Sequence, residues 1–421
     1  MPTDAALPER SRAGAVLALL APVAVAMPLR AAGEPAWQLT AAQAVTVHRN
    51  LLRLGDAQPA PDGLSRDDVQ TRTRLEGGLQ WRAGRQRLQA QARWHDVRHA
   101  RNARYDHPAW RLGLALDLAT AEAWSGTVAA ASRQALVPID ATGSGLLRER
   151  RLERVDDAAL RVQRGGAAQA VLAFDVGWRQ VGHDGAGPPL PARAQQAWHG
   201  GWALTWQPQG GASVGVDLRV ARARHEGAGL RGDAVRLAGW GLDLRAALPL
   251  SGASRIDLRI GHGRSRWSDD AARDHDGPTA SLAWSWQATA ASRLVLRATR
   301  SHGQHRVSAE PRFDEAVRAL DEVRREDRLR FDLDHRPGAQ WALSAGVELV
   351  QRRLVRAAAG AGVAAGGERA AQWRLGLVWT PRRFLRLDCQ WLHERQHARA
   401  APGVDLRAGQ LGCALGAELA P

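Results

Sequence analysis

Residues 110–118 have the sequence WRLGLALDL, in which every second residue is large and apolar. The residues between them are Arg111, Gly113, Ala115 and Asp117, which are charged or small. Successive side chains of an extended strand point to opposite faces, so this stretch predicts a strand with one apolar and one polar face. A tilted strand of about 9–11 residues can cross a lipid bilayer, and we therefore expect a membrane strand here.

The same alternation recurs along the chain, at 88–94, 170–178, 198–206, 214–220, 242–248, 256–260, 282–286, 341–349 and 373–379. The pattern supports about eighteen strands, with 16–18 as the expected range. Short turns and long polar loops alternate between these runs. The short turns fall near 82–85, 120–122, 165–167, 208–211, 249–253, 288–292, 336–339 and 380–383, and the long loops at 55–67, 98–108, 136–156, 182–197, 224–233, 266–278, 301–326, 353–370 and 395–404.

This alternation of turns and loops predicts an all-β fold, an antiparallel up-and-down transmembrane β-barrel in the bacterial outer membrane. Short turns at one rim and long loops at the other also predict that both termini lie in the periplasm. A soluble β-sandwich or β-propeller is the alternative. Its strands average about 5–6 residues and its connections do not alternate in this way, so the barrel is the better prediction.

The amino-terminal segment 1–32 is predicted to be a signal peptide, which leaves 33–421 as the barrel. Arg10 and Arg12 precede an apolar run at 13–27, and small-residue sites follow at 24–26 and 30–32. A charged region, a short apolar region and a small-residue cleavage site are the parts of a secretory signal. A buried helix of a soluble protein is the alternative. Beyond this segment no apolar run approaches the roughly 20 residues of a membrane-spanning helix.

Tryptophan supplies an independent indication, because the chain has 17 Trp beside one Tyr and four Phe. One set lies beside the short turns, namely Trp81, Trp206, Trp286, Trp341 and Trp379, and a second set lies at the loop ends of strands, namely Trp94, Trp110, Trp178, Trp198, Trp267 and Trp391. Indole rings favour the two membrane interfaces, so these sets predict two aromatic girdles. Trp202 and Trp240 fall in the middle of their strands and do not fit.

The charged residues fall mainly in the phase opposite to the apolar one. The formal net charge is +15, and arginine supplies every basic side chain apart from histidine. A charge facing lipid costs about 2–4 kcal/mol at the bilayer midplane, so these residues are expected to face the lumen. The predicted lumen-lining residues are Arg161, Arg179, Arg219, Arg245, Arg259, Arg297, Arg330, Arg374, Arg386, Asp217, Asp243, Asp257, Asp332 and Asp388.

Two interpretations of this lumen stay open. Guanidinium groups bind carboxylates and phosphates through paired hydrogen bonds, so a net-basic lumen suits an anionic polysaccharide or small anions. Alternatively, arginine and aspartate merely neutralise one another and keep the wall of the lumen hydrated. The expected partners are therefore outer-membrane lipid and an anion, and nucleic acid is not among them.

No pattern in the chain predicts an enzyme, a metal site or a cofactor. The phosphate-loop pattern is absent. The segments GASVG at 211–215, GAGLRG at 227–232 and HERQH at 393–397 match short catalytic or ligand patterns letter by letter, but they lie in the expected turns, loops and strands and lack the helix that each motif needs. The acidic loop at 269–276 is too short for a calcium-binding hand and is interpreted as solvated. The longest loop, 301–326, carries Phe313, Val317, Leu320 and Val323 at helical spacing. A short helix there is expected either to fold inward as a constriction or to cap the barrel.

The alternation also predicts how some strands pair. Cys389 and Cys413 share the lipid-facing phase of the last two strands, and a loop centred near 401 sets them opposite each other. Cross-strand Cβ atoms lie about 4.5–5.5 Å apart, so the pair is close enough for a disulfide, with two free thiols as the alternative.

Two further hairpins are predicted from charge. A turn centred on Ser251 places Arg245 opposite Asp257 and Asp243 opposite Arg259. The same logic around Pro381 pairs Arg374 with Asp388. Like charges directly opposite one another are unfavourable, which disfavours a shift of the first hairpin that would set Arg245 against Arg255.

Short motifs in the first part of the chain carry a family resemblance. They are HRNLLRL at 48–54, the segment from Ser65 to Val69, GRQRL at 84–88, Tyr105-Asp106 and WSG at 124–126. In these motifs the chain resembles the EpsL-like family, outer-membrane barrels associated with exosortase-linked extracellular polysaccharide biosynthesis. The family usually has two acidic residues where this chain has His48 and Arg49, and beyond Gly126 the resemblance is one of architecture.

The resemblance implies a channel that takes part in exporting an extracellular polysaccharide, together with periplasmic components of an export machinery. The residues alone lead to the alternative, a general or anion-preferring porin without a polysaccharide role. In both hypotheses the protein is a non-enzymatic channel with a basic lumen.

Overall fold

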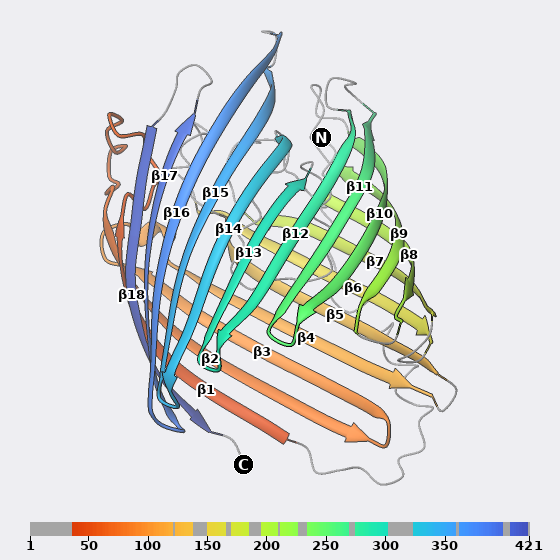
Figure 1. Ribbon diagram of the computed structural model, residues 1–421. Coiled ribbons are helices and arrows are strands. Elements are labelled where there is room, and N and C mark those ends of the chain that lie inside the picture. Colours follow the sequence, from red (N-terminus) through yellow and green to blue (C-terminus); the bar gives the residue numbers. More distant parts are fainter. Residues whose placement is uncertain are drawn as a thin grey trace, which may run out of the picture.

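The computed structural model describes residues 36–120, 123–137, 150–165, 170–184, 195–208, 211–225, 234–268, 274–301, 323–358, 362–398 and 405–419. These residues form one antiparallel sheet of 18 strands (Figure 1), in which each strand pairs with its neighbours in the chain. The strands are β1 (Ala36–Arg49), β2 (Asp68–Ala83), β3 (Gln86–His99), β4 (His107–Ala119), β5 (Trp124–Leu136), β6 (Leu152–Arg164), β7 (Ala170–Asp184), β8 (Gln195–Trp206), β9 (Ser213–His225), β10 (Val235–Ser251), β11 (Ser254–Trp267), β12 (His275–Thr289), β13 (Ser292–Ser301), β14 (Val323–Gly338), β15 (Trp341–Ala358), β16 (Gly362–Arg382), β17 (Leu385–Ala398) and β18 (Asp405–Leu419). β1 pairs with both β2 and β18, so the sheet closes and the predicted 18-stranded barrel is confirmed.

The connections alternate as predicted. Each even-numbered strand leads into the next through a short turn, such as 84–85, 252–253 and 383–384, whereas most of the connections at the other rim are long. The hairpin turns lie together at the lower rim in Figure 1. Leu39 near the start of β1 lies opposite Leu419 at the end of β18, so the barrel begins and ends at the turn rim. The placement of this rim in the periplasm stays a prediction.

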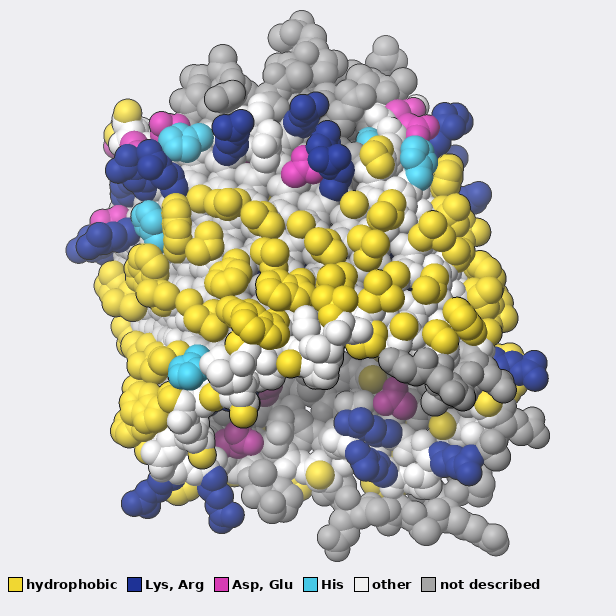
Figure 2. Space-filling view, in the orientation of Figure 1, with side chains coloured by type: hydrophobic (Ala, Val, Ile, Leu, Met, Phe, Trp, Pro, Cys, Tyr) yellow, Lys and Arg dark blue, Asp and Glu magenta, His cyan; other side chains and the backbone are white. Residues whose placement is uncertain are grey.

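The two phases of each strand face opposite environments. Outward-facing apolar side chains are exposed, with Val220 at 53% and Leu244 at 59%, while the inward-facing Asp217 and Asp243 on the same two strands are each only 2% exposed. Figure 2 shows that the apolar side chains form a belt around the visible face, with charged side chains above and below it. An exposed apolar belt is the surface that a lipid bilayer covers.

Tryptophan pairs lie near both rims of the barrel. Trp341 lies opposite Trp379 beside the turns, and their rings stack with centroids 5.5 Å apart. Trp178 lies opposite Trp198 near the loop rim, with ring centroids 6.4 Å apart. These pairs fit two interface girdles, but Trp267, which was predicted for the loop-end girdle, faces the interior and is 9% exposed.

Trp240, one of the two tryptophans that did not fit the predicted girdles, also lies beside polar groups. Trp240 lies opposite Arg264 on β11. Arg264 contacts Asp276, with Nε and Oδ2 3.5 Å apart, and both side chains are substantially exposed. Trp240 therefore borders an outward-facing polar cluster, and it lies in the half of the 17-residue strand β10 that is nearer the loop rim.

The register of β17 and β18 agrees with the prediction. Cys389 lies directly opposite Cys413, and the two sulfur atoms form a disulfide. The outward-facing neighbours Leu387 and Leu411 place this bond on the lipid side. The sequence had left the bonded and free states open, and the structure contains the bonded one.

The predicted register of the β10–β11 hairpin is wrong by two residues. Arg245 lies opposite Arg259 instead of Asp257, and Asp243 lies opposite Gly261 instead of Arg259. The turn is at 252–253, and the pairing shifts between Pro249 and Ser251. Proline has no backbone N–H to donate, so a local irregularity at this position is expected. The charged side chains nevertheless share the predicted face.

The second charge-based register is also wrong. Arg374 lies opposite Leu392, and Asp388 lies opposite Val378. The pairing of β16 with β17 shifts between Trp379 and Arg382, and the turn follows at 383–384, beyond the predicted centre. Arg374 and Asp388 still face the lumen, but they are separated along the hairpin.

Some predictions fall outside the described residues. The signal peptide at 1–32 does, and so does most of the predicted helix in the loop 301–326. Val323, the last apolar residue of that helical pattern, belongs to strand β14. Among the residues that the structure describes, no helix is long and apolar enough to cross a membrane.

Candidate functional site: the arginine-lined lumen

All of the predicted lumen-lining residues face the interior of the barrel. Each lies in the strand phase opposite to the exposed apolar side chains, as the strand pairings require. An 18-stranded barrel is too wide for its own side chains to fill, so this wall borders an aqueous lumen. The structure gathers most of these residues into two clusters and leaves the others in isolated pairs.

The first arginine cluster lies on β9–β11 and consists of Asp217, Arg219, Asp243, Arg245 and Arg259. Arg219 and Arg259 both contact Asp243, the second with Nη2 and Oδ2 2.5 Å apart, and Arg245 contacts Asp217. The two aspartates lie directly opposite each other on neighbouring strands, and the arginines reach them diagonally. Like charges are therefore tolerated side by side because each carboxylate has its own guanidinium partners.

The carboxylates of this cluster lie flat against the wall. Asp243 lies opposite Gly261, and a side chain at that glycine would collide with its carboxylate. The hydroxyl of Thr279 also donates to Asp243, with Oγ1 and Oδ1 3.2 Å apart. As a result the Asp217 and Asp243 side chains are 3% and 2% exposed, whereas those of the three arginines are 32–51% exposed.

The second arginine cluster lies on β13–β16 around Asp332. The guanidinium groups of Arg330, Arg374 and Arg297 approach this carboxylate to 2.7, 3.5 and 3.7 Å. Glu348 adds a second carboxylate, 3.9 Å from Arg374. The Asp332 and Glu348 side chains are 18% and 12% exposed, and those of the arginines are 22–34% exposed. A cavity of about 390 Å³ opens beside this cluster.

The remaining predicted residues form smaller groups. Arg179 pairs with Asp157 at 2.5 Å, and Arg161 lies opposite Asp175. Two pairs lie along single strands, Arg386 with Asp388 at 3.2 Å and Arg255 with Asp257 at 2.9 Å. The lumen is therefore charged around much of its wall, and the two clusters bring together six of the nine predicted arginines.

The prediction missed the glutamates that help to hold the arginines. Glu76 receives two hydrogen bonds from Arg93, and Arg352 lies between Glu326 and Glu368 at 2.8 and 2.5 Å. All of these residues lie in the inward phase of their strands, so the alternation that identified the aspartates also contained the signal for them.

The segment 50–67, which joins β1 to β2, lies against the inner wall at the loop rim. Arg53 forms two hydrogen bonds with the inward-facing Glu394 on β17, at 2.6 and 2.8 Å. Leu52 and Leu54 are fully buried together with Tyr105 of the 3-10 helix η1 (Ala103–Tyr105), where burial raises the pKa of the tyrosine. Most of the motif residues that carried the family resemblance therefore meet at this rim.

Asparagine holds the start of this segment in place. Asn50 adopts a left-handed backbone conformation with φ 58°, which asparagine tolerates better than most residues. Its side-chain amide donates to the carbonyls of Leu54 and Arg407, at 2.7 and 2.8 Å. The segment is thus fixed to β18 as well as to β17.

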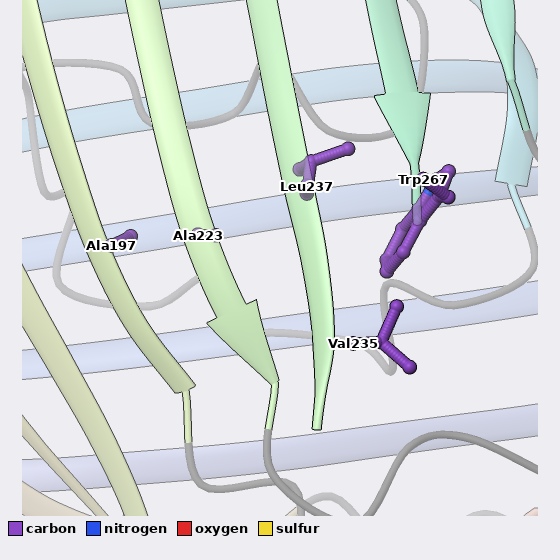
Figure 3. Packing of buried hydrophobic residues seen from close by; sticks show 5 residues of the cluster. All are labelled: Ala197, Ala223, Val235, Leu237 and Trp267. Carbon is purple, nitrogen blue, oxygen red and sulfur yellow. The ribbon is translucent and has the colours of Figure 1, made fainter. Parts of the chain in front are cut away.

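A small apolar cluster lines the mouth on the opposite side of the barrel. Figure 3 shows Ala197, Ala223, Val235, Leu237 and Trp267 on the neighbouring strands β8–β11. All five are in the inward phase and at most 9% exposed. The mouth is therefore apolar above the first arginine cluster, whereas the wall below is charged.

The part of the chain that the structure describes contains no candidate metal site. There, no group of three or more histidine, cysteine, aspartate or glutamate side chains is placed to hold an ion. The chemistry available in the lumen is that of guanidinium, carboxylate and amide groups.

Known proteins resemble this chain in fold. No family model and no curated protein matches it. The structure of OccK2 (OpdF) from Pseudomonas aeruginosa in complex with glucuronate is 15% identical, with a TM-score of 0.51, over 92% of this chain and 98% of that one. A second structure of OccK2 has 13% identity and a TM-score of 0.51 over 93% and 100%. The outer membrane protein OpdK of the same organism has 14% identity and a TM-score of 0.47 over 91% and 99%.

These identities are low, so the likeness to OccK2 concerns the fold. It supports the barrel architecture over nearly the whole chain. The comparisons give no support to the EpsL-like resemblance.

Proposed function

We propose that this protein is a bacterial outer-membrane channel that passes small anions and prefers carboxylates. The observation that carries the proposal is the unequal exposure of opposite charges in the two arginine clusters. In the first cluster the carboxylates are 2–3% exposed and the guanidinium groups 32–51%. A solute in the lumen therefore meets arginine more than aspartate, because the carboxylates lie behind the guanidinium groups.

This arrangement addresses the alternative that the two charges cancel. A guanidinium group paired with a carboxylate on one side keeps N–H donors on its other side. A carboxylate solute offers the paired acceptors that such donors match. The hidden aspartates hold the arginines in place and lower the cost of bringing them together, while the solute contacts the exposed side.

The structure of OccK2 with glucuronate is consistent with this proposal, because glucuronate is a carboxylated sugar bound by a protein of similar fold. The exposed apolar belt supports placement in the outer membrane. We further propose that 1–32 is a secretory signal and that the turn rim faces the periplasm, as in other barrels with this alternation of turns and loops. The proposal assigns no catalytic activity.

Export of an extracellular polysaccharide is the second candidate. It rests on the motifs at 48–54, Ser65–Val69 and Tyr105-Asp106, which meet in the segment at the loop rim. A deletion strain distinguishes the two functions. Loss of extracellular polysaccharide without any change in anion uptake would favour export, and the reverse would favour the anion channel.

Uptake into proteoliposomes tests the leading proposal. We expect glucuronate to enter faster than uncharged glucose. The double variant Arg245→Gln, Arg297→Gln removes one exposed arginine from each cluster. We expect it to reduce the preference for glucuronate. Arg222→Gln removes the same charge from the exposed, outward side of β9 and is the matched control. Equal uptake of both sugars, or equal effects of the lumen and control variants, would contradict the proposal.

A further inference from the structure

A second feature of the lumen lies away from both arginine clusters. A trough of about 680 Å³ runs across the inner wall formed by β1–β8. This volume is within the range of about 300–1,000 Å³ that is typical of small-ligand sites. Its inward-facing lining is mainly amide, alanine and glycine, so it differs in chemistry from the charged wall on β9–β16.

The strand pairings arrange this lining in two parallel rows. The first row consists of Gln38, Gly78, Gln91, Gly113, Ala131, Asp157 and Arg179 on successive strands. The second row consists of Gln80, Gln89, Ala115, Ala129, Ala159, Gly177 and His199. Four glutamines therefore occupy one end of the trough, and charged or ionisable groups occupy the other.

The glutamines at this end lie along the wall. A Cβ atom added at Gly78 would be 3.0 Å from the side chain of Gln38, and one added at Gly113 would be 3.0 Å from that of Gln91. Each of these two amides thus covers the glycine on the next strand. The absence of a side chain at the glycines lets the amides form part of the trough floor instead of standing in the lumen.

The floor in the middle of the trough is smooth and made of alanine, and Arg111 on β4 borders it. Ala115, Ala129, Ala131 and Ala159 present only methyl groups. At the far end Asp157 and Arg179 are engaged with each other at 2.5 Å. A floor of methyl groups beside flat amides offers no pocket for selecting side chains, and the charged groups lie at the border of the trough, with Arg111 on one side and Asp157 and Arg179 at the far end.

We propose that this trough binds an uncharged, polyhydroxylated ligand, namely a short neutral oligosaccharide. A glutamine amide both donates and accepts hydrogen bonds, as a sugar hydroxyl does, so several amides in a row match several hydroxyls. The methyl floor suits the apolar face of a sugar ring. This inference needs the lumen to be accessible, as the proposed channel function requires, but it does not depend on anion preference.

Titration calorimetry of the purified barrel in detergent tests the trough directly. The probes are maltotriose, a galacturonate trimer and an N-acetylated trialanine amide. We expect maltotriose to bind and the Gln38→Leu, Gln91→Leu variant to weaken it by at least about tenfold. Gln410→Leu changes an inward-facing glutamine on β18, outside the trough, and should leave the affinity unchanged.

A second variant covers the case in which the double leucine variant does not fold. Ala131→Leu fills the middle of the trough, keeps every glutamine and is expected to abolish binding. Absence of maltotriose binding, or binding that survives both trough variants, would overturn the proposal. Preferential binding of the charged trimer or the blocked peptide would overturn it as well. Reversal-potential measurements on the same variants report anion preference separately. Failure of the trough proposal can therefore be distinguished from failure of the anion-channel proposal.

Discussion

At the scale of single residues, the central feature is a carboxylate buried behind arginines. Asp243 is 2% exposed and accepts from Arg219, Arg259 and Thr279. Burying a charge is costly unless it is paired and hydrogen-bonded, and here both conditions are met. The aspartate therefore stabilises a group of like charges that would otherwise repel one another in the wall.

Replacing this aspartate is expected to separate stability from selectivity. Asp243→Asn keeps an acceptor for Thr279 and leaves two arginines that water can still reach, so the barrel should stay folded. Its anion preference should rise, because the exposed positive charges lose their counter-charge. Bilayer recordings of the variant measure this change, and an unchanged preference would contradict it.

The converse change leaves the buried carboxylate without its arginines. The Arg219→Gln, Arg259→Gln variant is expected to lose about 3 kcal/mol of stability, at the lower end of the cost of breaking a buried ion pair. The temperature at which the folded band disappears from a semi-native gel should fall. A folded band as heat-resistant as that of the wild type would count against the buried pair.

That the predicted charged residues point into the barrel could be inferred from the alternation alone. Arg245 and Asp257 lie on the predicted face because a strand has a side-chain period of two. Their partners could not be predicted, since pairing depends on where the turn falls. We expected repulsion to keep like charges from lying opposite each other, but Arg245 does lie opposite Arg259. This pairing is tolerated because Asp217 on the neighbouring strand β9 contacts Arg245.

At the scale of elements, the described segment 50–67 lies inside the barrel at the loop rim. It lies against inward-facing residues of β17, and its own Leu52 and Leu54 are completely buried. The sequence also predicted that the loop 301–326 either constricts or caps the barrel, and most of that loop lies outside the described residues. The apolar alternation of 48–54 is too short to reveal that it packs inside a barrel.

Loosening this segment is expected to widen the channel. Leu52→Ala with Leu54→Ala removes buried packing worth about 2–5 kcal/mol per leucine. Single-channel conductance should become larger or fluctuate between levels. Leu411→Ala, on the exposed lipid side of β18, is the matched control and should leave the conductance unchanged. The same conductance in both variants would show that the segment does not restrict the lumen.

The last hairpin carries a prediction of its own. Cys389 and Cys413 are bonded across β17 and β18, so neither should react with a maleimide after denaturation without reductant. After reduction both should react. Intact-mass spectrometry distinguishes the two states, and labelling of both cysteines before reduction would refute the bond. This register could be predicted because the pairing of β17 with β18 has no register shift between Leu385 opposite Ala417 and His397 opposite Asp405.

At the scale of the whole molecule, 18 strands enclose a lumen whose wall has two unlike regions. Strands β9–β16 present the two arginine clusters. Strands β1–β6 present glutamine, alanine and glycine along the trough, beside a row formed by Arg93, Arg111 and Arg133. The strand number and the closure could be predicted from the repeated alternation. The division of the wall could not, because it depends on which residues of distant strands share a row.

The ion selectivity of the open channel tests the central claim most directly. In a planar bilayer with a KCl gradient, the sign of the reversal potential reports whether chloride or potassium is the more permeant ion. Exposed guanidinium groups over buried carboxylates predict a chloride-preferring channel, with a preference that weakens as salt screens the wall. A reversal potential of the opposite sign, showing preference for potassium, would contradict the account.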